Sequence, residues 1–290
     1  MSGSTVEIVG PGEVLVGERT SVADGVQFIF HRPAKLVIGD YCTIGPGVKF
    51  VIDGGDVEVG DWTTLHDRCL VLSGQGVRIG QNCWFGQNCV LDGTGGLTVG
   101  NGVRVGMYSQ IWSHVAAGEQ IEGCTLFGTR PVIIEDDVWL VGSCIVASGV
   151  TIGRRSVALI ASNITKSWPE ESTLAGSPAS LKENLNFYRP IDISEKWVLL
   201  EGWLSKACSD LGLIRVPHER ALIYRWMDQS NEDSIVFLKT EQDESLISPV
   251  GSRTTVCFLS SKFYRKRLTD IEHSVLKYLA GNKARFKSIN

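Results

Sequence analysis

The sequence lacks the features that mark several classes of protein. It has no apolar run of about 18 residues, the length that a membrane-spanning helix needs, so we expect no integral membrane segment. Residues 1–7 carry neither the basic nor the apolar region of a signal peptide, and we therefore expect a cytoplasmic protein. The chain has 28 basic and 32 acidic residues, and its one short basic run, residues 262–267, does not supply the basic face of a nucleic-acid-binding protein.

Metal-binding and disulfide motifs are also missing. The eight cysteines form no CxxC or CxxH pair, and in a reducing cytoplasm we expect them to be free thiols. The five histidines are scattered along the chain, and no second histidine follows closely after His114. Three ligands for one zinc ion cannot be drawn from this spacing, so we expect no metal.

Glycine, in contrast, is abundant, with 32 residues, and it belongs to a repeat. An apolar residue recurs every six positions through the first 165 residues, in groups of three: Val16, Val22, Phe28; Ile38, Ile44, Phe50; Val59, Leu65, Val71; Ile79, Phe85, Leu91; Val99, Val105, Ile111; Ile134, Leu140, Val146; Ile152, Ala158, Ile164. An α-helix cannot keep a six-residue apolar period on one face, because it has 3.6 residues per turn.

The six-residue period is typical of short strands on the edges of a triangular coil, a parallel β-helix. We expect the first residue of each unit to point inward and to stack on its equivalent one coil away. The fifth residue is small and should fill the narrow interior near each corner, where a thiol acts as a small hydrophobic group. Five cysteines hold this position: Cys42, Cys69, Cys83, Cys89 and Cys144. Glycine often holds the second position, where we expect a tight corner with positive φ.

One interval breaks this rhythm. The step from Val99 to Ile134 exceeds one coil by about 15 residues, which places an insertion between His114 and about Thr129. Insertions in such a coil form loops on one face, and loops of this kind often carry the function.

These patterns divide the chain into four segments: an N-terminal cap at 1–15, the hexapeptide-repeat domain at 16–168, a connecting segment at 169–190 and a small α+β module at 191–290. Within the module we expect a helix that ends at Gly212, strands within 221–227, 234–240 and 254–260, and a last helix over 262–279. The basic run would then be a solvated helix start, with an anionic partner as the alternative.

His114 is the candidate acid–base residue, because it is the histidine beside the insertion and imidazole titrates near neutral pH. Asp92 lies one coil earlier near the same edge and is a candidate to orient the His114 ring, although the run Asp-Gly-Thr-Gly-Gly is equally good turn chemistry. Trp112 and Trp139 are near the insertion in sequence and are expected to contact ligands rather than to be merely exposed.

Several segments resemble hexapeptide-repeat O-acetyltransferases. They are Ile-Glu-Asp-Asp-Val-Trp-Leu at 134–140, Ala-Ser-Gly-Val-Thr-Ile-Gly at 147–153, Thr-Lys at 165–166 and Ala-Gly-Ser-Pro-Ala at 175–179. The runs at 91–100 and 111–114 are most similar to the polysaccharide-modifying members. The resemblance covers roughly residues 16–182 and also extends to the maltose/galactoside and xenobiotic acetyltransferases.

The resemblance implies a left-handed β-helix, a homotrimer, and acetyl-CoA bound as acyl donor in the groove between neighbouring β-helices. It implies that His114 is the general base and that Trp139 lies at the acetyl-CoA groove. Residues matching the pantetheine and nucleotide ends are Gly142, Ile160, Ala161, Thr165 and Lys166. Ser180 stands where a basic residue is frequent in the family, so Lys166 or Lys182 would meet the 3′-phosphate.

We therefore expect an acetyl-CoA-dependent O-acetyltransferase that acts by direct transfer on a sugar hydroxyl of a polysaccharide or glycolipid precursor. Two alternatives stay open. One is a non-catalytic trimeric scaffold whose terminal module binds a partner. The other is an N-acyltransferase of an amino sugar, although those relatives have a carboxylate next to the histidine and this chain has Val115.

Overall fold

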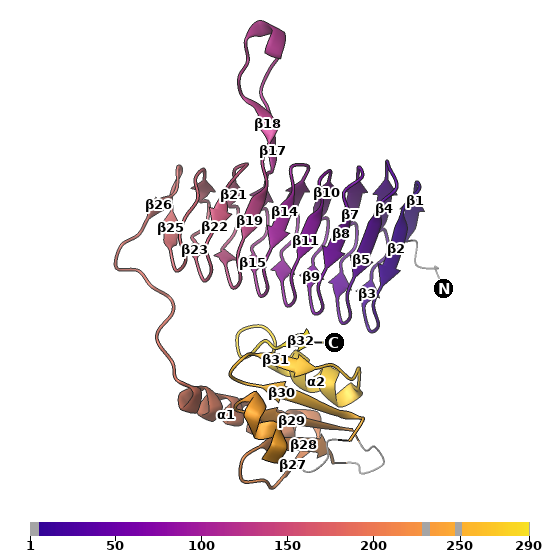
Figure 1. Cartoon of the computed structure of the whole chain (residues 1–290), viewed down its shortest axis with the longest axis vertical. Helices are drawn as coiled ribbons and strands as arrows, with labels where there is room; N and C mark the ends of the chain where they lie inside the picture. Colours follow the sequence, from indigo (N-terminus) through magenta and orange to yellow (C-terminus); the bar gives the residue numbers. More distant parts are fainter. Residues whose placement is uncertain (1–5, 228–232, 247–250, 290) are drawn as a thin grey trace. The chain divides into compact units, whose positions relative to one another are not determined.

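The computed structural model describes residues 6–227, 233–246 and 251–289, and it divides the chain into two units, Met1–Tyr188 and Arg189–Asn290. Short strands build the first unit and stack in three sheets that run along a β-helix (Figure 1). Sheet A has the order β1 (Glu7–Val9), β4 (Gln27–Phe30), β7 (Lys49–Ile52), β10 (Leu70–Ser73), β13 (Val90–Gly93), β16 (Gln110–Ile111), β21 (Ile145–Val146) and β24 (Asn163–Ile164).

The other two sheets complete each coil. Sheet B has the order β2 (Glu13–Val16), β5 (Lys35–Ile38), β8 (Val57–Val59), β11 (Val77–Ile79), β14 (Leu97–Val99), β19 (Val132–Ile134) and β22 (Thr151–Ile152). Sheet C has the order β3 (Ser21–Val22), β6 (Thr43–Ile44), β9 (Thr64–Leu65), β12 (Trp84–Phe85), β15 (Arg104–Val105), β20 (Trp139–Leu140), β23 (Val157–Ala158), β25 (Thr173–Ala175) and β26 (Ser180–Leu181). All neighbours in the three sheets pair in parallel except β25 and β26.

The predicted inward stack is confirmed. Strand register places Ile38 against Val59, Val59 against Ile79 and Val99 against Ile134, and these side chains are buried in one continuous core. The apolar residues that open the later units are buried as expected, and so are the small residues at the fifth position, apart from half-buried Thr20 in the first coil. The exceptions lie in the first coil, where Val16 is exposed and Val22 is half-buried.

The expected role of the second-position glycines is wrong. Gly39 and Gly106 are not at positive φ. A Cβ on Gly39 would lie 2.8 Å from the backbone nitrogen of Asp61, and one on Gly106 would lie 1.9 Å from the carbonyl oxygen of Val141. The second position is therefore glycine because the backbone of the next coil lies too close for a side chain. Positive φ falls two residues later, for example at Tyr108 with φ 61°.

The β-helix also extends beyond the predicted bounds of 16–168. Strands β1 and β2 begin within residues 1–15, and β25 and β26 lie within the segment 169–190 that was expected to be a connection. The irregular residues between β24 and β25 interrupt the six-residue period, and this hides the last coil in the sequence.

The second unit contains a six-stranded sheet and two helices. The sheet has the order β27 (Leu213–Val216), β28 (Leu222–Trp226), β29 (Ser234–Leu238), β30 (Thr254–Phe258), β31 (Phe263–Arg265) and β32 (Lys287–Ile289). Its helical segments are α1 (Ile193–Leu211), the 3₁₀ segment η2 (Glu241–Leu246) and α2 (Asp270–Leu279). Helix α1 ends at Gly212 with φ 69°, as predicted. No helix in the described ranges is both long and apolar enough to cross a bilayer.

The prediction that the basic run begins a helix is wrong. Residues Phe263–Arg265 form β31 and pair with β30 and β32, and Tyr264 is fully buried. Helix α2 begins only at Asp270, because the side chain of Thr269 caps it by accepting a hydrogen bond from the Glu272 N–H.

Candidate active site

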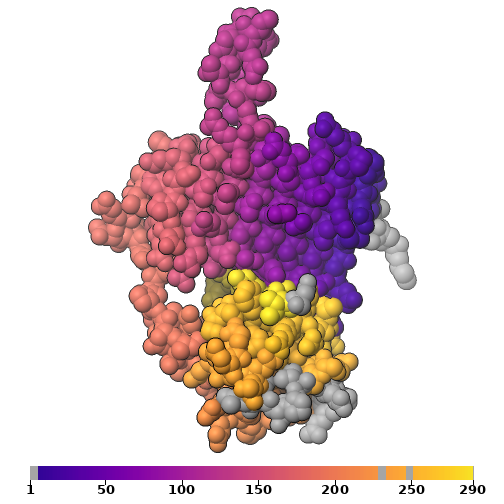
Figure 2. All heavy atoms as spheres, in the orientation of Figure 1, coloured from indigo at the N-terminus to yellow at the C-terminus, as the bar shows by residue number. Residues whose placement is uncertain are grey.

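The predicted insertion forms a β-hairpin that projects from the corner between sheets A and B (Figure 2). Strands β17 (His114–Ala116) and β18 (Phe127–Thr129) pair antiparallel, and a 3₁₀ turn, η1 (Gln120–Glu122), lies between them. His114 is opposite Thr129 at the base of the hairpin. The insertion therefore fixes His114 where the hairpin joins the regular coil.

The structure brings His114 and Asp92 together. The His114 Nδ1 atom lies 2.8 Å from Asp92 Oδ2, although 22 positions separate the two residues in the sequence. The Asp92 side chain is completely buried, whereas 37% of the His114 side chain is exposed. Because the two residues lie in successive coils, the buried Asp92 carboxylate comes into contact with the accessible His114 imidazole.

Asp92 is hydrogen-bonded to Ser113 and Thr94 as well as to His114. Its Oδ2 atom accepts from the Ser113 N–H at 2.7 Å and from the Ser113 hydroxyl at 2.9 Å, and its Oδ1 atom accepts from the backbone N–H and hydroxyl of Thr94. Burial raises the pKa of this carboxyl and is the largest single effect. The hydrogen bonds from Thr94, His114 and Ser113 together outweigh it, so the pKa of Asp92 is held below its usual value.

This network sets the tautomer of His114. An ionised Asp92 can only accept, so His114 Nδ1 carries the hydrogen and Nε2 keeps its lone pair. The arrangement can therefore accept a proton at Nε2 and stabilise the resulting imidazolium through the Asp92 carboxylate. Turn chemistry and ring orientation were rival interpretations of Asp92 in the sequence, and the structure shows that one carboxylate does both.

Two residues of this network, Ser113 and Thr94, were missed by sequence reasoning. Ser113 also accepts a hydrogen bond from the Gly95 N–H at 2.8 Å, which ties the coil of Asp92 to the coil of His114. The available signal was the Asp-Gly-Thr spacing, in which Thr94 follows Asp92 by two positions, as in many side-chain-stabilised turns. The predicted substrate residue, Trp112, lies beside His114. The centroids of the two rings are 5.8 Å apart, and the rings meet edge to face.

The residues expected to line the donor groove lie in coils that follow His114. Gly142, Ile160 and Ala161 occupy the corner between sheets C and A. Thr165 and Lys166 occupy the corner between β24 and Trp168, which bridges to Ile152 of sheet B. These two corners border the outer face of sheet A. Ile160 and Lys166 are exposed, and the Lys166 amine lies over the Trp168 ring at 4.6 Å. The sequence did not single out Ile145, which is exposed on β21 between the two corners.

Trp139 does not lie with these residues. It projects from β20 on sheet C, in register with Arg104, and 46% of its surface is exposed. Sheet C borders neither side of the corner that holds His114. Within one chain, the structure therefore separates Trp139 from the His114–Asp92 pair.

Metal ligands are not clustered in the described parts of the chain. Residues 6–227, 233–246 and 251–289 contain no group of three or more His, Cys, Asp or Glu side chains that could hold an ion. Five of the cysteines fill the interior of the β-helix, where Cys42, for example, has its thiol pKa raised to about 12 by burial.

Comparisons with known proteins agree with this architecture. A family profile described as "Hexapeptide repeat of succinyl-transferase" matches residues 76–107 and 131–161. Nodulation protein L of Rhizobium meliloti is 33% identical over 127 residues, which span 43% of this chain and 69% of that relative. Galactoside O-acetyltransferase of Lactococcus lactis is 27% identical over 149 residues, which span 51% of this chain and 63% of that relative.

A solved structure shows the same fold. The polySia specific acetyltransferase NeuO superposes with a TM-score of 0.54 and 19% sequence identity, over 67% of this chain and 94% of that chain. The expected left-handed parallel β-helix is thereby supported for the first unit. The match to the Rhizobium protein spans 43% of this chain, and the family profile matches only residues 76–107 and 131–161. Neither comparison covers all 290 residues.

Proposed function

The chain belongs to the hexapeptide-repeat acetyltransferase family, and from this membership we propose that it transfers an acetyl group from acetyl-CoA to a sugar hydroxyl of a glycan or glycan precursor. The observation that carries the proposal is the contact of 2.8 Å between the buried Asp92 carboxylate and the half-exposed His114 imidazole at the base of the inserted hairpin.

The reaction needs a base because a sugar hydroxyl does not ionise near pH 7. In the proposed direct transfer, His114 Nε2 takes the hydroxyl proton as the oxygen bonds to the acetyl carbonyl carbon. The carbon–sulfur bond of the thioester then breaks, and the thiolate leaves with the proton returned by His114. Asp92 holds the ring through Nδ1 and stabilises its transient positive charge. The products are the acetyl ester and free CoA, so atoms and charges balance.

The donor would bind along sheet A in the coils after His114. Acetyl-CoA supplies an acetyl group that is already activated as a thioester. Exposed Ile145 and Ile160 offer apolar contact to a pantetheine arm, and Lys166 offers a cation to a phosphate. Lys182, whose amine donates to Ser180 Oγ at 3.2 Å, is the other candidate for the 3′-phosphate.

A homotrimer would explain the position of Trp139. If the donor groove lies between neighbouring β-helices, sheet C of one copy can form the wall opposite sheet A of the next, and Trp139 then contacts the donor bound beside another copy's His114. This placement is part of the proposal and rests on the separation of Trp139 from His114 within one chain.

The test is His114→Ala, with His31→Ala as the matched control. His31 is an exposed histidine near the same corner, in an early coil. Purified proteins would be assayed for thiol release from acetyl-CoA with a panel of sugars and amino sugars as acceptors. We expect His114→Ala to lose about 10²–10⁴-fold in turnover and His31→Ala to match the unmodified protein. The melting temperature of His114→Ala should fall only slightly, because Asp92 keeps its hydrogen bonds from Ser113 and Thr94. Full activity of His114→Ala would refute the assignment of His114. No thiol release by the unmodified chain with any acceptor would favour the scaffold interpretation, and transfer to amines alone would favour the N-acyltransferase.

A further inference from the structure

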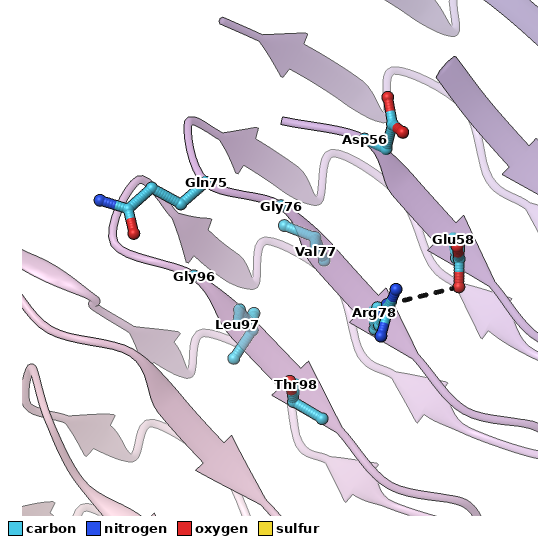
Figure 3. A pocket seen from close by; sticks show the side chains of 9 residues that line it. All are labelled: Asp56, Glu58, Gln75, Gly76, Val77, Arg78, Gly96, Leu97 and Thr98. Carbon is cyan, nitrogen blue, oxygen red and sulfur yellow. Dashed lines mark ion pairs between the residues drawn. The ribbon is translucent and has the colours of Figure 1, made fainter. Parts of the chain in front are cut away.

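A hollow of about 380 Å³ lies on the outer face of sheet B, in the coils that precede His114 (Figure 3). This volume is within the usual range of small-molecule sites, about 300–1,000 Å³. It has no part in the donor groove, whose candidate residues all lie in later coils. Nothing in the reaction as described above uses it.

Two glycines lie in the lining of this hollow. Gly76 and Gly96 directly precede β11 and β14, and both line the hollow without a side chain that would extend into it. Polar side chains surround the opening: Asp56 and Gln75 lie near the corner, and a row of three crosses the strands, with Glu58, Arg78 and Thr98 in register.

The lining offers donors and acceptors in a form suited to hydroxyl groups. The Arg78 guanidinium lies 3.6 Å from the Glu58 carboxylate, so these two charges largely compensate. Asp56 accepts the Lys35 backbone N–H through Oδ1 and adds a further negative charge. The net charge of the lining is therefore negative, which favours a neutral, hydroxyl-rich ligand over an anionic one.

The hollow is connected to the His114 site through the hairpin. The Gln75 amide lies 3.5 Å from the Thr129 hydroxyl, and Thr129 is the residue opposite His114 at the hairpin base. Thr94, which donates to Asp92, belongs to the same turn as Gly96. The corner at Gln75 is two coils from the corner at Ser113, about 10 Å at the usual spacing of strands. An extended molecule can therefore reach both places.

We infer that this hollow is an acceptor subsite, which binds a second ring of an extended neutral glycan whose reacting hydroxyl lies at His114. The inference rests on the proposed function and adds to it that the acceptor is an oligosaccharide of at least two rings. Donor and acceptor then approach His114 from opposite directions along the β-helix, the donor from later coils and the acceptor from earlier ones.

The test is to fill the hollow and measure glycan binding directly. Thr98→Trp places a large ring over the opening, and tryptophan is well tolerated on an exposed strand position. The matched control is Thr43→Trp, the same exchange at an exposed strand position on sheet C. Both variants would be compared with the unmodified chain on an array of neutral and anionic glycans of one to four rings, and each would also be made in the His114→Ala background.

We expect the unmodified chain and Thr43→Trp to bind neutral glycans of two or more rings more tightly than single rings. Thr98→Trp should lose this preference, with binding of the longer glycans weakened by about tenfold, the factor that one or two lost hydrogen bonds represent. His114→Ala should keep the preference, which separates this inference from the catalytic proposal. Unchanged binding in Thr98→Trp, no preference for longer glycans in the unmodified chain, or binding of anionic glycans alone would each overturn it.

Discussion

Replacing Asp92 with asparagine tests the site most sharply, because it changes charge and hydrogen bonding with almost no change in shape. The carboxylate accepts hydrogen bonds from His114 Nδ1, from the N–H and hydroxyl of Ser113 and from those of Thr94. An asparagine has only one oxygen, so its amide group must face the donors on one side. The hydroxyls can rotate, and His114 can move its hydrogen from Nδ1 to Nε2, but a backbone N–H cannot adapt.

The expected costs follow from these contacts. One buried N–H without a partner costs about 1–3 kcal/mol of stability. In either orientation the negative charge that stabilises the His114 imidazolium is lost, so we expect Asp92→Asn to lose about 10²–10⁴-fold in turnover. Thiol release with acetyl-CoA and a sugar acceptor measures the second effect, and urea unfolding measures the first. Asp53→Asn is the control, because the Asp53 side chain is half-exposed and pairs with Arg32 at the surface.

The difference in unfolding free energy between the unmodified chain and Asp92→Asn should depend on pH. Because the pKa of Asp92 is lowered in the folded chain, its ionised form contributes stability that is present above the unfolded value, about 3.9, and is lost as the pH falls through the lower folded value. The gap in unfolding free energy between the unmodified chain and Asp92→Asn should therefore narrow in acid. A turnover within twofold of the unmodified chain, or a gap that does not change with pH, would refute the reasoning.

Three further predictions test the donor site, the coil stacking and the thiols. Trp139→Ala should raise the Michaelis constant for acetyl-CoA more than it lowers turnover in steady-state assays, and the opposite split would remove Trp139 from the donor groove. Gly106→Ala should destabilise the chain by several kcal/mol in urea unfolding, because its Cβ would overlap the backbone of the next coil. Gly202→Ala, which has open space around it in α1, should instead stabilise the chain by about 0.5–1 kcal/mol. Alkylation of the folded protein followed by mass spectrometry should label the partly exposed Cys124 well before buried Cys42, and equal labelling would contradict the interior placement.

Much of the β-helix could be predicted from the sequence because its core is periodic. Each inward residue contacts its equivalent in the next coil, so one six-residue rule describes the whole interior and also locates the hairpin by its interruption. The role of the glycines could not be predicted in the same way. A composition rule does not distinguish a residue that turns the chain from one that lets two backbones approach, and the contact of Gly106 with Val141 is visible only in three dimensions.

The candidate site was predictable to a similar degree. The insertion identified His114, and the spacing of one coil suggested Asp92, because both follow from counting residues. The part played by Ser113 and Thr94 depends on which side chains turn inward at an irregular corner, where the period gives no guidance. In the second unit, the sequence predicts a helix where residues Phe263–Arg265 form β31, because so short a strand has no strong period. Helix α2 begins later, after the cap at Thr269.

The pairing of His114 with Asp92 across two coils has a consequence for how activity would respond to partial unfolding. In a stacked coil each turn is supported only by its neighbours, so loss of structure starts at the ends and moves inward. We expect the first coil to be the least stable, because its Val16 is exposed where the equivalent residues of later coils are buried. The proposed catalytic pair lies several coils away from it, in the interior of the stack. Gentle heating should therefore melt the first turns while acetyl transfer continues, and enzymatic activity should survive the earliest spectroscopic change.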